Sequence, residues 1–258
     1  MALIVTIANQ KGGVGKTITS INLAAALGAQ RCKTLLVDMD PQGHSSLSFI
    51  DKLDGRLSIQ SVFRGEASLV DVIRPVTDEN IDILPSSIAL SKVERDLVTE
   101  IDGHFKLKDL IVQVAGDYDF VIIDTPPALG MLTINCLVAT DYVIIPIQSS
   151  YLSLEGTDDL LETIQKIRNR FNPKLRILGA LITIHDRRTI LGKDIKNRIK
   201  EVFSKQVFST IIHRAVRLEE CPAYRESIFR YAPKSASAEE YRRLGKEVIK
   251  RVGTSRSA

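Results

Sequence analysis

The chain has 258 residues, of which 44% are hydrophobic and 26% are charged, a composition typical of globular proteins and not of disordered or fibrous ones. Residues 1–184 contain 17 Lys and Arg against 22 Asp and Glu, whereas residues 185–258 contain 18 against 9. These balances of −5 and +9 predict a polyanion-binding surface in the last third of the chain. Three widely spaced cysteines exclude a disulfide framework, and no run approaches the ~20 apolar residues of a membrane span. We therefore expect a soluble protein in a reducing, intracellular compartment.

Short runs rich in Val, Ile and Leu alternate with helical patterns along the chain. The predicted strands are 3–8, 34–37, 81–84, 120–123, 142–147 and 176–182, and the helical patterns include 18–27 and 132–139. Such runs are typical of parallel strands buried on both faces, so we expect a doubly wound α/β fold, its mostly parallel sheet covered by helices on both faces. The irregular stretch 45–80 is interpreted as a surface insertion. We expect a single domain over residues 1–252 and a disordered tail at 253–258.

A lysine- and glycine-rich septet, Lys11-Gly-Gly-Val-Gly-Lys-Thr17, lies between the first predicted strand and the following helix. Glycines let backbone N–H groups approach an anion, and the helix N-terminus adds partial positive charge. Lys16 would reach the β- and γ-phosphates of a nucleotide, and the Thr17 hydroxyl would bind Mg²⁺. The septet departs from the usual G-x-x-x-x-G-K-[ST] pattern, because Gln10 stands at the first glycine position. The predicted nucleotide-binding residues are Lys11, Gly12, Gly13, Val14, Gly15, Lys16, Thr17 and Ile18.

Acidic residues follow two of the predicted strands. Asp124 comes directly after 120–123, and Asp38 and Asp40 come after 34–37. Ligands of open α/β sheets bind at the carboxyl ends of the strands, so we expect Asp124 to hold magnesium through water. A carboxylate at the other strand end could orient an attacking water. The serines that follow, at 45, 46 and 48, are interpreted as loop or cap residues.

The lysine-first loop, the segment Asp38-Met-Asp-Pro-Gln-Gly43 and the segment Asp124-Thr-Pro-Pro127 together resemble the ParA/Soj family of deviant Walker-A ATPases, which have a P-loop NTPase fold. The resemblance continues through 135–141, 144–148, 154–156 and 216–218, and covers essentially the whole chain. It implies an ATPase that needs ATP and Mg²⁺ and forms a homodimer in the ATP state. Lys11, Lys16 and Asp40 would be its catalytic residues, with Lys11 reaching the partner's phosphates, and Thr17 and Asp124 would be on the magnesium side.

The resemblance also implies a biological cycle. Family members bind double-stranded DNA nonspecifically in the ATP state, and a ParB-like partner stimulates hydrolysis and releases them. The cycle segregates plasmids or chromosomal origins, so the expected location is the cytoplasm, at the nucleoid. The chain departs from the family pattern in two places: Ile18 stands where many members have Thr, and Ile212-His-Arg-Ala215 replaces the usual I-P-R-N, which lies near the adenine in relatives. We therefore assign no adenine contacts, and the four scattered histidines show no spacing for catalysis or metal binding.

A basic helix is predicted in the last third of the chain. Over 190–203, helical spacing places apolar residues on one face and three lysines on the other. Cationic side chains suit sequence-independent contacts to phosphates, and the family resemblance aligns Arg188 and Arg217 with DNA-contacting arginines. The predicted DNA-binding residues are Arg187, Arg188, Lys193, Lys196, Lys200, Arg214 and Arg217.

Three other functions remain open. A membrane-surface ATPase of the MinD kind would need an amphipathic C-terminal helix, and 239–252 carries an apolar stripe flanked by basic residues. Because the stripe lacks Trp and Phe, a final helix packed on the sheet is favoured, and a membrane partner is not expected. An ATPase of the nitrogenase iron-protein type would need paired thiolate ligands, whereas Cys32 and Cys136 suit buried structural thiols. Related ATPases also position other cargoes, such as chemoreceptor arrays or microcompartments, and nothing in the sequence excludes that role.

Overall fold

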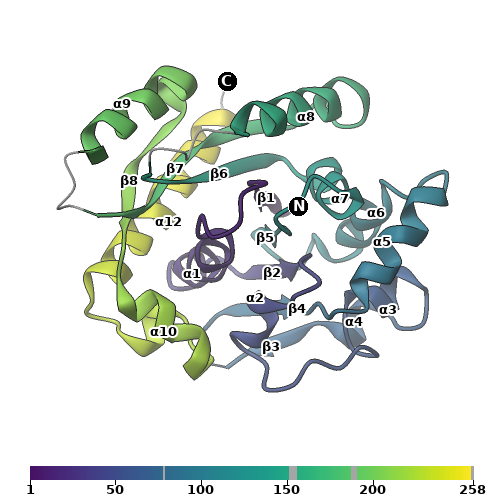
Figure 1. Cartoon of the computed structure of the whole chain (residues 1–258). Helices are drawn as coiled ribbons and strands as arrows, with labels where there is room; N and C mark the ends of the chain where they lie inside the picture. Colours follow the sequence, from purple (N-terminus) through teal and green to yellow (C-terminus); the bar gives the residue numbers. More distant parts are fainter. Residues whose placement is uncertain (78, 151–155, 187–190, 257–258) are drawn as a thin grey trace.

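The computed structural model describes residues 1–77, 79–150, 156–186 and 191–256. These residues form one eight-stranded sheet with helices on both faces (Figure 1). The strands are β1 (Leu3–Ile7), β2 (Thr34–Asp38), β3 (Arg74–Val76), β4 (Ile81–Leu84), β5 (Phe120–Asp124), β6 (Tyr142–Gln148), β7 (Arg176–His185) and β8 (Val207–His213). The helices are α1 (Lys16–Gly28), α2 (His44–Leu47), α3 (Ile59–Phe63), α4 (Leu69–Val72), α5 (Leu90–Thr99), α6 (Lys106–Val114), α7 (Met131–Ala139), α8 (Thr157–Arg170), α9 (Leu191–Phe203), α10 (Val216–Tyr224), α11 (Ile228–Tyr231) and α12 (Ala236–Arg256), with a 3₁₀ turn at Ser204–Gln206.

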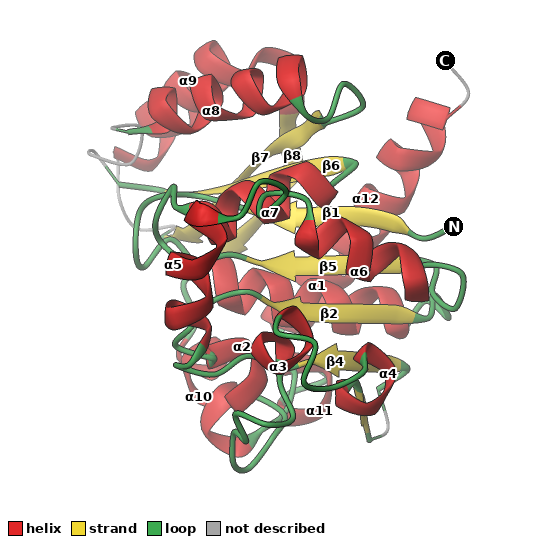
Figure 2. Ribbon diagram, turned by 90° about the vertical axis from the view of Figure 1, so that its right-hand side faces the viewer, coloured by secondary structure: helices red, strands yellow, loops and turns green. Residues whose placement is uncertain are grey.

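The strand order is β3-β4-β2-β5-β1-β6-β7-β8, and β1 lies near the centre between β5 and β6 (Figure 2). Neighbouring strands of the described chain are parallel except for β3, which pairs antiparallel with β4. The predicted mostly parallel, doubly wound sheet is therefore confirmed. The strands that follow β1, from β2 to β5, all lie on one side of it, whereas β6, β7 and β8 lie on the other side. The strand order therefore reverses at β1. Ligands bind at such a switch point, outside the carboxyl ends of the strands.

The central strands are apolar because both of their faces are buried. Successive side chains point to opposite faces, so Leu36 packs into one core while Leu35 and Val37 pack into another. The first core includes side chains of α1, α10, α11 and α12, and the second includes side chains of α3 to α7. A third core packs α8 and α9 against β6 and β7 (Figure 1).

The interpretation of 45–80 as a surface insertion is wrong. The segment forms three short helices and the edge strand β3, and several of its apolar side chains belong to the second core. β3 contains Pro75, which an edge strand tolerates because one side of its backbone needs no ladder hydrogen bonds. The buried apolar side chains of this segment are Ile59, Val62, Phe63, Leu69 and Val72.

The C-terminal helix α12 packs against α1 and β8 (Figure 1). Its stripe of Tyr241, Leu244, Val248 and Val252 is buried in the first core, so the prediction of a final helix packed on the sheet is confirmed. The stripe is therefore not available to lie on a lipid surface. α12 continues to Arg256, into the residues for which the sequence predicts a disordered tail. No helix within the described ranges is long and apolar enough to cross a membrane.

Candidate nucleotide-binding site

The glycine-rich loop joins β1 to α1 at the carboxyl edge of the sheet. Gly13 has φ 72° and Gly15 has φ 81°, a left-handed conformation that glycine adopts without strain. Gly15 is the N-cap of α1, so the loop leads directly into the positive end of the helix dipole. A Cβ atom placed on Gly12 or Gly13 would meet no atom within 4 Å, which leaves the loop backbone open to a ligand.

Neighbouring strands hold the loop in place. Asn9 donates a hydrogen bond from Nδ2 to the Pro146 carbonyl of β6 (2.7 Å), and its Oδ1 accepts one from the Lys11 backbone N–H (3.0 Å). From β7, the Thr183 hydroxyl donates to the Val14 carbonyl (2.8 Å). These bonds fix both ends of the loop, so an anion would meet a preorganised backbone.

Lys16 is the first residue of α1 and is only 7% exposed. Its Nζ donates to the Lys11 carbonyl at 2.8 Å, so the ammonium group points into the loop. Burial lowers the pKa of Lys16, and the negative charges of Asp124 and Asp40 oppose that shift. Because an ammonium group has three donors, Lys16 can bind this carbonyl and still donate to phosphate oxygens.

Asp124 ends β5 and is fully buried. Its Oδ1 accepts from the Ser20 hydroxyl of α1 (2.9 Å), and its Oδ2 accepts from the Ser45 hydroxyl of α2 (2.7 Å). Burial raises the pKa of this carboxyl, while hydrogen bonds from Ser45, Ser20 and Thr17 act to lower it. Thr17 and Asp124, both predicted on the magnesium side, thus lie together, and hydroxyl and carboxylate oxygens are the ligands that Mg²⁺ prefers.

Asp38 ends β2 directly opposite Asp124 and is also fully buried. Its Oδ2 accepts from the Ser46 backbone N–H (2.8 Å) and hydroxyl (2.7 Å), and its Oδ1 accepts from the Asp40 N–H (3.0 Å). Burial and the charge of Asp124 raise the pKa of Asp38 to about 7. Asp38 therefore organises the turn that carries Asp40.

Asp40 lies in this turn and is 8% exposed. Its Oδ1 accepts from the Gln42 N–H (2.9 Å), and its carbonyl accepts from the Gly43 N–H (2.9 Å). Gly43 has φ 66°, and a Cβ there would come within 2.6 Å of Leu53. The negative charge of Asp40 acts on both Lys16 and Asp124, so the turn lies within electrostatic range of the glycine-rich loop.

The interpretation of Ser45 and Ser46 as loop or cap residues is wrong. They are adjacent in α2, yet each donates to a different buried carboxylate, Asp124 and Asp38 respectively. A pair of hydroxyl residues shortly after a strand that ends in an acid is the sequence pattern that could have indicated these hydrogen bonds.

The raised pKa of Asp38 predicts how the free energy of unfolding depends on pH. The folded-state pKa of about 7 lies above the ordinary value of 3.8, so between these pH values the folded state keeps a proton that the unfolded state has lost. The free energy of unfolding should therefore fall as the pH rises through this window, by an amount of the order of a few kcal/mol. Urea unfolding at pH 5 and pH 8, without nucleotide, should show a smaller fall for Asp38→Asn than for the wild type. Equal falls in the two proteins would contradict the assignment.

The three predicted DNA-binding residues whose side chains the structure describes do not form one cluster. Lys200 is exposed on α9, Arg214 is exposed between β8 and α10, and Arg217 is exposed in the first turn of α10. Both views place α9 and α10 well apart, at the two ends of the β8 edge (Figures 1 and 2). The residues or side chains that lie outside the described part are Arg187, Arg188, Lys193 and Lys196.

Two adjoining cavities extend from the start of α1 toward α12. The smaller, about 80 Å³, is lined by Gly15 and Ile18 of the loop region, and the larger, about 550 Å³, reaches α12. They share the lining residues His213, Arg214 and Ala215. The segment that departs from the family pattern therefore borders both cavities.

Comparison with known proteins agrees with this geometry. A family model described as an AAA domain matches residues 2–177. The sporulation initiation inhibitor protein Soj of Bacillus subtilis is 43% identical over 249 residues, which cover 96% of this chain and 98% of Soj. The chain belongs to the ParA/Soj family of partitioning ATPases. A second member of this family, the chromosome partitioning protein ParA of Myxococcus xanthus, is 40% identical over 96% of this chain and 88% of its own.

Solved structures of related chains share the fold of this ParA/Soj-family protein. A crystal structure described as cobyrinic acid a,c-diamide synthase from Mycobacterium smegmatis, with bound ADP and magnesium, is 33% identical with a TM-score of 0.87 and covers 99% of this chain and 97% of its own. A putative plasmid partition protein from Borrelia burgdorferi bound to AMPPNP is 26% identical with a TM-score of 0.81, covering 99% and 100%. The match to these nucleotide-bound structures extends over the whole P-loop NTPase fold.

Proposed function

We propose that this chain is a DNA-segregation ATPase that dimerises with ATP, binds DNA nonspecifically in that state and is released when a partner stimulates hydrolysis. The observation that carries the proposal is the meeting of Lys16, Asp124 and the Asp38–Asp40 turn around an open glycine-rich loop. A buried ammonium group close to acids at strand ends suits the binding of a nucleoside triphosphate and a divalent cation. The relationship to Soj and ParA supports the partitioning role.

ATP and Mg²⁺ fit the residues present. Backbone N–H groups of 11–15 would bind phosphate oxygens, Lys16 would donate to the β- and γ-phosphates, and Ile18 would border the nucleoside. Thr17 and Asp124 would hold the cation, directly or through water. When bound, Mg²⁺ supplies charge neutralisation on the phosphates.

Hydrolysis in this arrangement depends on positioning. Asp40, held in its turn by Asp38, would orient the attacking water, and Lys16 would stabilise negative charge that develops on the transferred phosphoryl group. Lys11 would contribute from the facing subunit. Because each nucleotide would then be neutralised partly by the other subunit, ATP would favour the homodimer.

DNA binding would use the basic last third of the chain. Lys200 is on α9 and Arg217 on α10, two helices on the β8 side of the molecule (Figure 1), and two copies in a dimer would double the number of phosphate contacts. Holding two weak DNA-binding sites on one rigid dimer raises their effective concentration. ATP binding would thereby increase DNA affinity without a large conformational change in either subunit. We propose a ParB-like protein as the partner that stimulates hydrolysis, and the cytoplasm, at the nucleoid, as the location.

Two alternatives differ in how well they are supported. A MinD-like membrane role is poorly supported, because the apolar stripe of α12, the candidate membrane-binding surface, is buried. A ParA-like ATPase that positions a non-DNA cargo would share the same nucleotide site, so DNA binding itself is the property that separates it from the main proposal.

The proposal predicts DNA binding that depends on both nucleotide and charge. A random-sequence duplex should bind at least about tenfold more tightly with ATP than with ADP or without nucleotide, since only the dimer engages both basic sites. Lys11→Ala should lose this ATP-dependent gain. Lys200→Ala combined with Arg217→Ala should weaken binding with ATP about tenfold and reduce its salt dependence, because two phosphate contacts are removed from each subunit. Fluorescence anisotropy at several salt concentrations measures these effects.

A matched control is available on α5, on the other side of the molecule (Figure 1). Lys92 and Arg95 are both exposed there, so Lys92→Ala combined with Arg95→Ala removes the same charges without touching the basic third. This variant should bind like the wild type. Equal binding in all three nucleotide conditions, or an unaffected Lys200/Arg217 variant, would contradict the proposal.

A further inference from the structure

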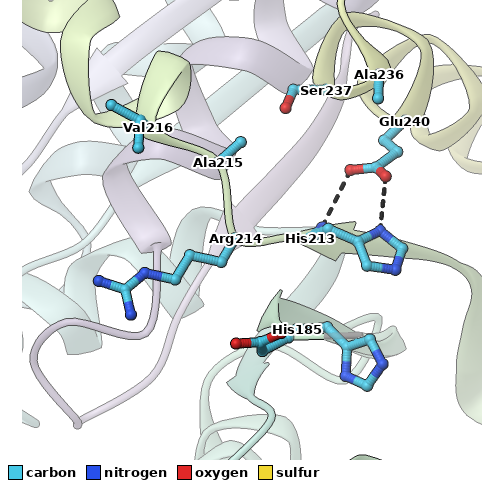
Figure 3. A pocket seen from close by; sticks show the side chains of 9 residues that line it. His185, His213, Arg214, Ala215, Val216, Ala236, Ser237 and Glu240 are labelled. Atoms are coloured by element: carbon cyan, nitrogen blue, oxygen red, sulfur yellow. Dashed lines mark hydrogen bonds and ion pairs between the residues drawn. The ribbon is translucent and has the colours of Figure 1, made fainter. Parts of the chain in front are cut away.

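In the cavity of about 550 Å³ beside the nucleotide site, polar side chains already bind one another (Figure 3). Glu240 of α12 is only 1% exposed, and its Oε2 accepts from the His213 backbone N–H at 3.0 Å. Its Oε1 lies 2.6 Å from Nδ1 of the same residue, so one carboxylate holds both the backbone and the ring of His213. His185 at the end of β7 joins them, with its ring centroid 5.3 Å from that of His213. This cavity belongs to the nucleotide site.

A separate cavity of about 270 Å³ lies along the chain between α2 and α3, beside the start of β3 and the end of β4. It shares no lining residue with the two cavities beside the nucleotide site. Its volume is slightly below the range of sites for drug-sized ligands, so it suits a small molecule. Its apolar lining residues are Phe49, Ile50, Leu53, Leu57, Pro75 and Pro85.

Two cationic side chains, Lys52 and Arg74, line the same cavity. The Arg74 guanidinium group is anchored by the backbone, because its Nη1 donates to the carbonyls of Asp71 (2.6 Å) and Ile73 (3.3 Å). A guanidinium group has five N–H donors in a fixed fork, so donors remain for a ligand. Such a fork matches the two oxygens of a carboxylate.

Nearby acids do not neutralise these two cations. Within the part of the chain that the structure describes, no ion pair joins Lys52 or Arg74 to an acidic side chain. Asp51 is paired with Arg225 of α10 instead. Asp54 is the acidic residue among those that line the cavity, so two positive charges face one negative charge. The cavity therefore has a surplus of positive charge, which favours an anionic ligand.

Ser86 adds a polar group to the wall of the cavity. It is fully buried, and its hydroxyl has no hydrogen-bond partner among the described residues. Leaving a buried hydroxyl unpaired is unfavourable, and an oxygen of a ligand would satisfy it. An apolar wall, surplus positive charge and an unpaired hydroxyl together suit a ligand that has a hydrocarbon body and a carboxylate end.

The cavity also borders the Asp38–Asp40 turn. Leu53 packs closely on Gly43, because a Cβ atom on that glycine would lie 2.6 Å from the leucine side chain. The Ser86 backbone N–H donates to the Ser46 hydroxyl (2.9 Å), which in turn donates to the Asp38 carboxylate (2.7 Å). A ligand in the cavity would therefore contact two residues that support this turn.

We propose that this cavity binds a small amphipathic carboxylate and that its occupancy changes the rate of ATP hydrolysis through the Asp38–Asp40 turn. The hydrocarbon part would lie against the apolar wall, and the carboxylate would accept hydrogen bonds from the cationic side chains. Binding to the cavity does not depend on the nucleotide. The effect on hydrolysis rests on the proposed function, because it assumes that Asp40 orients the attacking water.

The first test uses the wild-type chain without nucleotide and therefore does not depend on the folding of any variant. Octanoate, octan-1-ol and acetate are titrated separately, and binding is measured by calorimetry. We expect octanoate to bind at least about tenfold more tightly than the other two, because octan-1-ol lacks the charge and acetate lacks the hydrocarbon chain. Absence of octanoate binding would overturn the site, and equal affinities for octanoate and octan-1-ol would overturn the role of the cations.

The second test locates the bound octanoate. Lys52→Gln combined with Arg74→Gln removes both cations, so this variant should bind octanoate no more tightly than octan-1-ol. Lys92→Gln combined with Arg95→Gln is the matched control, because both residues are exposed on α5 and neither lines the cavity. The control should keep the wild-type preference. A preference that persists in the Lys52/Arg74 variant would mean that octanoate binds elsewhere and would overturn the assignment.

The third test measures release of inorganic phosphate from ATP with and without saturating octanoate. The wild-type rate should change about fivefold or more, the lower end of typical coupling between two sites, whereas the rate of the Lys52/Arg74 variant should not respond. An unchanged wild-type rate would overturn the coupling and leave both the binding site and the ATPase proposal intact. A chain that binds octanoate but hydrolyses no ATP would overturn the proposed function and the coupling, and not the cavity assignment.

Discussion

Lys16→Ala is expected to reduce ATP hydrolysis by at least about a hundredfold, the usual cost of removing one preorganised charge that faces the reacting phosphate. Lys16 is the buried cation of the loop, and its ammonium group already points at the loop carbonyl of Lys11. ATP affinity should fall as well, because the ground-state phosphates lose the same partner. Release of inorganic phosphate and binding of a fluorescent ATP analogue measure the two effects separately.

Lys174 provides the control for this substitution. It is exposed between α8 and β7, away from the glycine-rich loop in sequence, so Lys174→Ala removes one positive charge without changing the site. Its hydrolysis rate should match that of the wild type. If Lys16→Ala hydrolysed ATP within a few fold of the wild type, the glycine-rich loop would not be the catalytic site.

Tyr241→Ala should lower the free energy of unfolding by about 3–5 kcal/mol, the range for removing a large aromatic side chain from a core. Tyr241 is 1% exposed, and it fastens α12 to the core that α1 shares with the central strands. The measurement is urea unfolding followed by circular dichroism. A large loss would mean that α12 is an integral part of the fold, as its buried stripe indicates.

Tyr224→Ala is the matched control, because Tyr224 on α10 is 64% exposed. It stacks on Tyr231 with ring centroids 4.9 Å apart, so we expect a loss of at most about 1 kcal/mol. Equal losses for the two variants would contradict the assignment of α12 to the core. Binding of the wild-type chain to anionic liposomes in an ATP-dependent flotation assay would revive the membrane alternative.

The sheet could be predicted where its strands are central. β2 and β5 are buried at every position, so their apolar runs are continuous and easy to identify. β8 was not predicted, because it lies at the edge of the sheet and its burial alternates with exposed Ser209. β3 was missed for another reason: it has three residues, one of them Pro75, and only its pairing with β4 makes it a strand.

In the candidate site, features that depend on neighbouring residues could be predicted, whereas contacts between residues far apart in the sequence could not. The glycine-rich loop could be predicted because its conformation depends on a few consecutive residues. The grip of Glu240 on His213 could not, because it requires α12 to dock at the end of β8, 27 residues away in sequence. The partners of Asp124 are still farther away in sequence: Ser20 of α1 is 104 residues away and Ser45 of α2 is 79, and only the folded sheet brings them to one carboxylate.

The short helix α2 has a consequence for communication within the molecule. Its adjacent serines each hold one of the two opposed carboxylates, Ser45 on Asp124 and Ser46 on Asp38. The Ser46 hydroxyl also accepts from the backbone N–H of Ser86, beyond the end of β4. A change in the hydrogen bonding of either carboxylate would therefore act on the same single turn of helix. One turn of helix thus joins both buried carboxylates at the carboxyl edge of the sheet to the chain that follows β4.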